Sequence, residues 1–290
     1  MISDNTLKIV EFFNQRNNIS SFFYKDKPII IYNDHRTILN VLYSLYKLEY
    51  LNIKDPVNII SFDLHDDSFD SFKKSEIFDI LNVKRFDDIN IKDFFGFIEF
   101  DISVIDNDWV KVGMELNMIK DYLNIGALYS SNLNKKYIDE SGIKHDLIGI
   151  RHLDFELSNK ANGLLVDESN NKIKNIFNFN GNNFIEPKNK YILDFDLDCF
   201  TVQNKTTEIG DIDGVTIPWN ERTFQAMYKG FYDDYIMNFM ESLILNSEIV
   251  TICMEPFHCC SHLDSAILLS YLDKYLFEGK LGISLDYIQK

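Results

Sequence analysis

The chain has 290 residues, of which 46% are hydrophobic and 26% charged, and this ordinary globular composition excludes disorder and collagen-like structure. Its formal net charge of -16 argues against a nucleic-acid partner, which needs clustered Lys and Arg. The acidity is compatible with a cationic substrate or divalent metals, but on charge alone the commoner reason is that excess carboxylate keeps a protein soluble. The absence of a long apolar run, of a signal-peptide pattern and of a disulfide-like cysteine spacing leads us to expect a reduced, cytoplasmic protein with no membrane partner.

The predicted elements alternate between short apolar strands and amphipathic helices. Between residues 168 and 190, alternating Phe and Asn residues run into the Asn180-Gly181 turn, which indicates a protruding hairpin. Continuous apolar strands alternating with helices predict one α/β domain, residues 1–290, with a mainly parallel sheet. In chain order we expect a strand at 28–32, a helix at 37–48, a strand at 57–62, a weak strand at 125–129, strands at 146–150 and 190–195, a helix at 222–245, a strand at 248–254 and a helix at 266–276.

Four of these strands end in acidic or histidine side chains. In open parallel sheets, ligands bind outside the carboxyl ends of the strands. Side chains that are far apart in the sequence are therefore expected to converge there. They are His35, Asp63, His65, Asp67, Asp196, Asp198 and Glu255.

The segment Asp63-x-His65-x-Asp67 is the sharpest of these signals. In an extended chain alternate residues point the same way, so we expect three ligands on one side. Asp194-x-Asp196-x-Asp198 repeats the pattern with carboxylates alone. Imidazoles and carboxylates favour Mn²⁺ or a similar metal over a thiolate zinc site. So many carboxylates in one pocket would repel one another unless cations lay between them, which favours a pair of divalent ions.

This order of motifs, from Asp34-His35 to the late Glu255-Pro256, resembles the arginase/agmatinase/deacetylase superfamily. The resemblance implies a three-layer α/β/α fold and a centre of two Mn²⁺ ions bridged by two aspartates. It also implies that Glu255 grips the guanidinium group of the substrate. By this resemblance one ion would be held by His35, Asp63, Asp67 and Asp196, and the other by Asp63, His65, Asp196 and Asp198.

The chain departs from ordinary arginases at several positions. Tyr32-Asn33 replaces their Gly-Gly, Phe200-Thr201 stands in place of their Asp-Pro, and no Asn-x-His segment follows the metal loop. The segment Asn107-Asp108-Trp109-Val110, and Glu255-Pro256 followed by Cys259-Cys260, look more like the divergent branch that contains the peptide arginases. That similarity implies conversion of arginine to ornithine, with release of urea, inside a precursor peptide.

Roles beyond metal binding are assigned by the same interpretation. Asp198 would stabilise the intermediate and pass a proton, Glu255 would hold the substrate, and His258 would shuttle protons at the rim. Asn107 and Asp108 are expected to form a substrate-side loop, or to pack together with Trp109. A zinc site around His258-Cys259-Cys260 is disfavoured because its ligands lack the two paired halves of structural zinc sites.

Three other functions stay open at this point. The first is a ureohydrolase acting on free arginine or agmatine. The second is a metal-dependent deacetylase with one zinc ion. The third is a metal-supported peptide-binding module without turnover. The metal content, two Mn²⁺, one Zn²⁺ or none, separates them, while the oligomeric state is not predicted.

Overall fold

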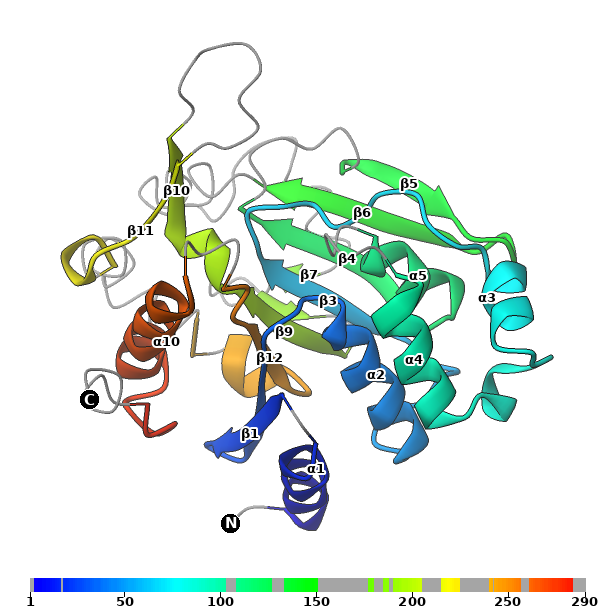
Figure 1. The fold of residues 1–290 in the computed structure, drawn as a ribbon, viewed down its shortest axis with the longest axis horizontal. Helices are drawn as coiled ribbons and strands as arrows, with labels where there is room; N and C mark the ends of the chain where they lie inside the picture. Colours follow the sequence, from blue (N-terminus) through cyan, green and yellow to red (C-terminus); the bar gives the residue numbers. More distant parts are fainter. Residues whose placement is uncertain are drawn as a thin grey trace.

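An eight-stranded sheet with the order β1-β2-β12-β9-β3-β4-β6-β5 runs through the centre of the protein (Figure 1). The six inner strands are parallel, and β1 and β5 pair antiparallel at the two edges. Its strands are β1 (Ile19–Tyr24), β2 (Lys27–Tyr32), β3 (Val57–Phe62), β4 (Ile119–Ile125), β5 (Lys135–Ile138), β6 (Lys144–Ile150), β9 (Tyr191–Asp196) and β12 (Val250–Cys253).

This computed structural model describes most of the chain. The described residues are 3–16, 18–102, 108–126, 133–150, 177–179, 185–187, 190–204, 215–224, 240–241, 243–256 and 261–283. Within these ranges no helix has both the length and the apolar character needed to cross a bilayer.

Two hydrophobic cores flank the sheet, because every residue of β3 and β9 is buried and both faces of these strands need cover. One core contains residues from α1, α2, α4 and α5, and the other contains residues from α10 together with Phe224 and Leu243. The protein is therefore a single α/β domain with helices on both faces of a mainly parallel sheet, as predicted. The helices are α1 (Asp4–Asn14), α2 (Thr37–Lys47), α3 (Lys74–Ile80), α4 (Ile91–Phe100), α5 (Trp109–Glu115) and α10 (His262–Leu276), with 3-10 turns η1 (Phe86–Asp88) and η2 (Leu197–Phe200).

Helix α2 begins two residues after His35, and its apolar side chains pack it against the sheet. Ile38, Leu39, Leu42 and Leu45 recur at three- and four-residue steps and are all completely buried. Burying each of these side chains stabilises the fold by about 1.5–3 kcal/mol. This packing fixes the N-terminus of α2, and with it the loop that leaves β2.

The strands predicted from apolar runs are confirmed as β2, β3, β6, β9 and β12, whereas residues 127–129 of the weak strand predicted at 125–129 lie outside the described residues. The strand there is β4, which ends at Ile125. Gly126 follows with φ of +135°, and a Cβ at this position would lie 2.5 Å from the backbone oxygen of Asp63. The strand therefore ends where only glycine allows the backbone to approach Asp63, the first residue after β3.

The remaining helices and strands lie after residue 176. Helix α10 confirms the predicted C-terminal helix. Residues 221–224 and 243–246 of the predicted helix at 222–245 are helical, and most of its centre lies outside the described residues. Separate two-stranded antiparallel sheets are formed by β10 (Thr201–Asn204) with β11 (Val215–Pro218), and by β7 (Phe177–Phe179) with β8 (Ile185–Pro187). The Asn180-Gly181 turn of the predicted hairpin lies outside the described residues.

Candidate metal centre

The carboxyl ends of four adjacent parallel strands carry the candidate ligands. His35 follows β2, Asp63 follows β3 directly, Asp196 is the last residue of β9, and Glu255 follows β12. The strand order places β12 and β9 between β2 and β3, so the carboxyl ends of these four strands lie side by side. The sheet thus brings together the side chains that the sequence predicted to converge.

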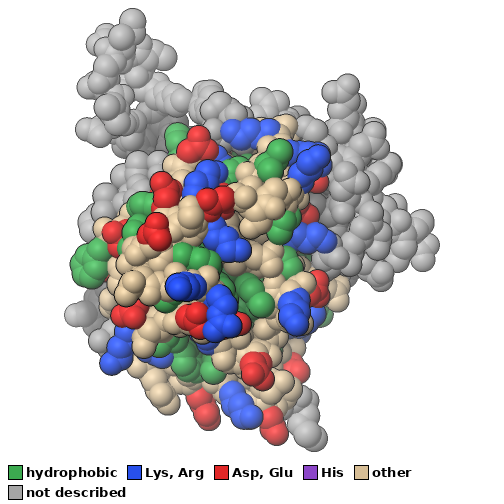
Figure 2. All heavy atoms as spheres, turned by 90° about the vertical axis from the view of Figure 1, so that its right-hand side faces the viewer, with side chains coloured by type: hydrophobic (Ala, Val, Ile, Leu, Met, Phe, Trp, Pro, Cys, Tyr) green, Lys and Arg blue, Asp and Glu red, His purple; other side chains and the backbone are tan. Residues whose placement is uncertain are grey.

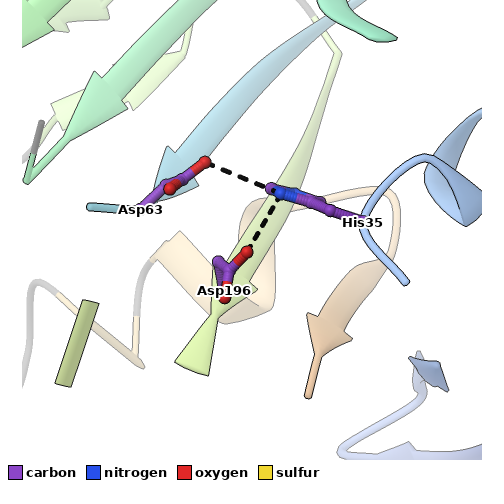
Figure 3. Close-up of side chains that lie close together, drawn as sticks. All are labelled: His35, Asp63 and Asp196. Carbon is purple, nitrogen blue, oxygen red and sulfur yellow. Dashed lines mark ion pairs between the residues drawn. The ribbon is translucent and has the colours of Figure 1, made fainter. Parts of the chain in front are cut away.

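One imidazole nitrogen faces three carboxylates at this edge. Nδ1 of His35 lies 2.8 Å from Asp67 Oδ2, 3.0 Å from Asp196 Oδ2 and 3.7 Å from Asp63 Oδ2. Figure 3 shows His35 between Asp63 and Asp196. A single nitrogen carries at most one proton, so it cannot hydrogen bond well to all three oxygens at once. The arrangement suits several ligands around one cation.

A second group of ligands shares Asp63 with the first. The donor atoms of His35, Asp63 and Asp196 lie within 4.8 Å of one another, and so do those of Asp63, His65 and Asp198. Nδ1 of His65 is 2.7 Å from Asp198 Oδ2. Asp63 therefore stands where a bridging ligand between two metal positions would be needed.

The metal loop reaches this arrangement by turning, not by extending. The Oδ1 atom of Asp63 accepts a hydrogen bond from the backbone N–H of His65 at 2.7 Å, which is an Asx-type turn. Asp67 then has a positive φ of 41°. The expectation of an extended 63–67 segment is therefore wrong, but its three side chains still face one site. Asp63 and His65 share a candidate group, and Asp63 and Asp67 both face His35.

Burial and crowding set the charge state of the carboxylates. Burial, and then the neighbouring Asp67 and Asp198, raise the pKa of Asp63 well above its usual range. Burial followed by Asp198 raises the pKa of Asp196 to about 7. In the same way burial and Asp196 raise the pKa of Glu255. These carboxylates are held together at a cost that bound cations would remove.

The pKa values of the two histidines are also raised, which for an imidazole favours the charged form. Asp198 is the main cause that raises the pKa of His65 to about 9. Burial alone would lower the pKa of His35, but Asp194 and Asp196 raise it well above its usual range. Burial would also raise the pKa of Asp198, yet the charge and hydrogen bond of His65 lower it. Without a cation, protons on the two imidazoles take the place that metals would occupy.

The residues present fit a divalent metal. The Oδ2 atom of Asp63 is buried and has no hydrogen-bond donor among the described residues. The cluster consists of imidazole nitrogens and carboxylate oxygens, which are ligands of Mn²⁺ and related ions. An unpaired buried carboxylate oxygen is costly unless a cation or a proton meets it.

Glu255 occupies a strained position next to Asp196. It is a non-glycine residue with φ of +34°, and only 6% of its surface is exposed. With Asp196 and Cys253 it forms a third group whose donor atoms lie within 4.8 Å of one another. Such strain persists only where the surrounding structure holds it in place, and it is common at functional sites. The sequence assigned no role to Cys253, because a buried cysteine within an apolar strand has no signal of its own.

Trp109 packs against His35 and Asp67 of the candidate metal centre. It is completely buried, its indole Nε1 donates to Asp67 Oδ2 at 2.7 Å, and its ring centroid lies 4.9 Å from that of His35. Of the two expectations for this residue, the structure supports packing. The hydrogen bond also fixes the carboxylate of Asp67.

Asp108 lies beside this support, and its Oδ2 accepts a hydrogen bond from Ser71 Oγ at 2.7 Å. It also lines a hollow of about 450 Å³. Asn107 and His258 lie outside the described residues, as do Cys259 and Cys260. The hollow is lined by Asp70, Ser71, Phe72, Glu76, Asp101 and Asp108.

Comparisons with known proteins add little to this geometry. No family model matches the chain, and no curated protein matches it. One similar solved structure is a crystal structure of a T. brucei arginase-like protein, a triple mutant bound with Mn²⁺. It is 11% identical, the match covers 95% of this chain and 68% of that one, and the TM-score is 0.32. A likeness this weak carries no argument, so the function rests on the site itself.

Proposed function

We propose that the protein is a Mn²⁺-dependent hydrolase that converts arginine side chains within a peptide to ornithine and releases urea. The observation that carries the proposal is the pair of ligand groups at the sheet edge that share Asp63. The ligand order along the chain, which resembles the arginase superfamily, supports the same assignment.

In this proposal two cations would be held by six side chains, and Asp63, which belongs to both candidate groups, and Asp196 would be shared between them. When bound, the two cations would supply Lewis acidity that brings the pKa of water towards neutrality. One cation is assigned to His35, Asp63, Asp67 and Asp196, and the other to Asp63, His65, Asp196 and Asp198.

The other steps belong to the side chains. Glu255 would bind the guanidinium group by charge-assisted hydrogen bonds, and its carboxylate lies within 4.8 Å of that of Asp196. Asp198 Oδ2, which is paired with His65 Nδ1 at 2.7 Å, holds or passes the proton that the departing amine needs. His258 is assigned the shuttle from solvent on the sequence alone.

A peptide substrate is favoured by the surroundings of the centre. Enzymes that bind free arginine need polar groups for its α-amino and α-carboxylate groups, whereas the loop after Asp67 continues with Ser68 and the half-exposed Phe69. The nearby hollow is lined by four carboxylates, which suits a cationic peptide. On the face that carries α3 and α4, basic and acidic side chains are intermixed (Figure 2), so attraction would come from the carboxylates of the hollow and not from a uniformly acidic face.

The test is a comparison of substrates with the Mn²⁺-loaded protein. An arginine-containing peptide, free arginine, agmatine and an acetyl-lysine peptide are incubated separately, with mass spectrometry for ornithine or lysine and a parallel urea assay. We expect urea and ornithine from the peptide, with a higher kcat/KM than for free arginine. A preference for free arginine or agmatine, or release of acetate alone, would contradict the proposal. The Asp196→Asn variant is the matched control for contaminating activity.

A further inference from the structure

Asp194 begins the carboxylate motif of β9, but it contacts a different atom of His35 from the one that Asp196 contacts. Its Oδ2 lies 2.8 Å from Nε2 of the imidazole, whereas Asp196 Oδ2 lies 3.0 Å from Nδ1. The ring is thus held between two carboxylates of one strand. The expectation that Asp194 acts with Asp196 and Asp198 as a row of similar ligands is therefore wrong, because Asp194 faces the back of the histidine.

The carboxylate of Asp194 is completely buried and surrounded by hydroxyl donors. Thr251 Oγ1 donates to Oδ1 at 2.6 Å, Tyr32 OH donates to Oδ1 at 3.2 Å, and Ser61 Oγ donates to Oδ2 at 2.7 Å. The sheet register explains this environment, because Ser61 on β3 and Thr251 on β12 lie directly beside Asp194. The two strands adjacent to β9 and the end of β2 thus supply hydroxyl donors for one carboxylate.

The hydrogen bonds to Asp194 determine which ring nitrogen of His35 carries the proton. An ionised carboxylate only accepts hydrogen bonds and offers about four sites. Three sites are taken by the hydroxyl groups of Tyr32, Ser61 and Thr251. The fourth contact is Nε2 of His35, which must then donate, and this leaves Nδ1 as the ligand atom.

We propose that Asp194 is a positioning residue that keeps the proton of His35 on Nε2 and directs Nδ1 at the cation assigned to Asp63, Asp67 and Asp196. The inference rests on the proposed metal centre. A carboxylate behind a metal-binding histidine fixes the ring and strengthens it as a ligand, and its loss typically lowers metal affinity about tenfold to a hundredfold.

The first experiment measures Mn²⁺ affinity, not turnover. Free Mn²⁺ is followed by electron paramagnetic resonance during titration of the full chain, for the wild type, Asp194→Asn and Thr251→Val. The threonine variant is the matched control, because it removes a donor to the same carboxylate but leaves the contact with His35. We expect Asp194→Asn to weaken one of the two sites by about tenfold to a hundredfold and to leave the other unchanged. Unchanged affinity in Asp194→Asn, or an equal loss in both variants, would overturn the proposal.

A double-mutant cycle with His35→Ala separates positioning from general electrostatics. If Asp194 acts through His35, Asp194→Asn causes no further loss of Mn²⁺ affinity once the imidazole is gone. Losses that add in the double variant would show that the carboxylate acts directly on the cation, against the proposal.

A measurement on the unmodified chain keeps the inference testable if the variants fail to fold. With ¹⁵N-labelled histidine and Zn²⁺ as a diamagnetic probe, nuclear magnetic resonance reports which nitrogen of His35 carries the proton. We expect the proton on Nε2, and a proton on Nδ1 would overturn the proposal.

The results also distinguish this inference from the proposed function. A wild type that binds no Mn²⁺ overturns both. A wild type that binds Mn²⁺ and depends on Asp194 but releases no urea supports the positioning role and contradicts only the hydrolase. Urea release with unchanged affinity in Asp194→Asn contradicts only the positioning role.

Discussion

Two regions of the molecule bury carboxylates in opposite ways. Glu115, at the end of α5, is completely buried but accepts hydrogen bonds from Lys73 Nζ at 3.1 Å, from the backbone N–H of Glu140 at 3.0 Å and from the hydroxyl of Tyr137. Burial alone would raise its pKa, but Tyr137, Glu140 and Lys73 together lower it. This carboxylate is satisfied entirely by the protein and has a structural role.

The carboxylates at the sheet edge are not balanced in this way. Asp63, Asp196 and Glu255 face one another and two histidines, and their pKa values are raised, not lowered. The main influences on the pKa values of Asp63, Asp196 and Glu255 are burial, other carboxylates and His35, and no Lys or Arg is among them. The comparison shows that burial by itself does not distinguish these carboxylates from Glu115, whereas crowding with other carboxylates does.

The largest expected effect is on Mn²⁺ content and turnover, and it comes from a change at the candidate metal centre. Asp196→Asn keeps the shape of the side chain but removes a carboxylate assigned to both cations. We expect loss of both Mn²⁺ ions and about a thousandfold or greater loss of turnover. Elemental analysis of protein purified in Mn²⁺ measures the first, and urea release measures the second.

Glu115→Gln is the control for that substitution, since it also neutralises a buried carboxylate. It should retain full Mn²⁺ content and lower the free energy of unfolding by about 1–3 kcal/mol, because Lys73 is half exposed and the pair is partly screened. Equal Mn²⁺ loss in both variants would show that the metal depends on overall stability and not on the candidate ligands.

The second prediction concerns the role of Glu255. Glu255→Gln should keep the metals yet lower turnover about a hundredfold, because it weakens a charge-assisted contact with the substrate. Mn²⁺ stoichiometry and kcat/KM are measured on the same sample. The grouping of Glu255 with Asp196 and Cys253 provides the competing outcome. If Glu255→Gln loses Mn²⁺ as fully as Asp196→Asn does, the glutamate is a metal ligand and its assignment to the substrate is wrong.

The third prediction follows from the raised pKa of Asp196. In the metal-free protein the folded state keeps a proton that the unfolded chain releases near pH 4, since the folded pKa is about 7. Stability is therefore lost as pH rises from about 4 to about 7. Asp196→Asn lacks this loss. In the presence of a chelator it should match the wild type near pH 4 and exceed it near pH 7.5 by roughly 1–4 kcal/mol, because one pKa unit corresponds to about 1.4 kcal/mol.

Denaturant unfolding at the two pH values measures this difference. Bound Mn²⁺ should reverse the trend, because protons and cations compete for the same oxygens. A wild type that stays as stable as Asp196→Asn at pH 7.5 in chelator would mean that the carboxylate is already balanced inside the protein, as Glu115 is.

Much of this organisation could be predicted because the central strands are buried on both faces. Residues 28–32, 57–62, 190–195 and 248–254 are continuous apolar runs, and each is followed by a potential ligand. The rule that ligands gather at the carboxyl ends of parallel strands then predicts the convergence. Local sequence is sufficient for this part of the site.

The rest depends on contacts between distant segments. The strand order places β9 between β12 and β3, and only this order surrounds Asp194 with Ser61 and Thr251. The turn at Asp63 likewise lies against Gly126, and Asp67, with its positive φ, accepts a hydrogen bond from Trp109, and the motif shows neither contact. Alternation along the sequence therefore selected the candidate ligands but gave the wrong orientation for Asp194.

The smallest expected effect concerns the hollow beside the centre. Asp108→Asn removes one of its four carboxylates while an amide oxygen can still accept from Ser71. We expect KM for an arginine peptide with a second basic residue to rise about threefold, as for the loss of one partly screened charge contact, with kcat and Mn²⁺ content unchanged. Glu140→Gln, which removes a carboxylate outside the hollow, is the matched control. Added salt should shrink the difference between the wild type and Asp108→Asn, because it screens exposed charges. An equal rise in KM for both variants would assign the effect to net charge, and a fall in kcat would place Asp108 closer to the reacting group than the hollow suggests.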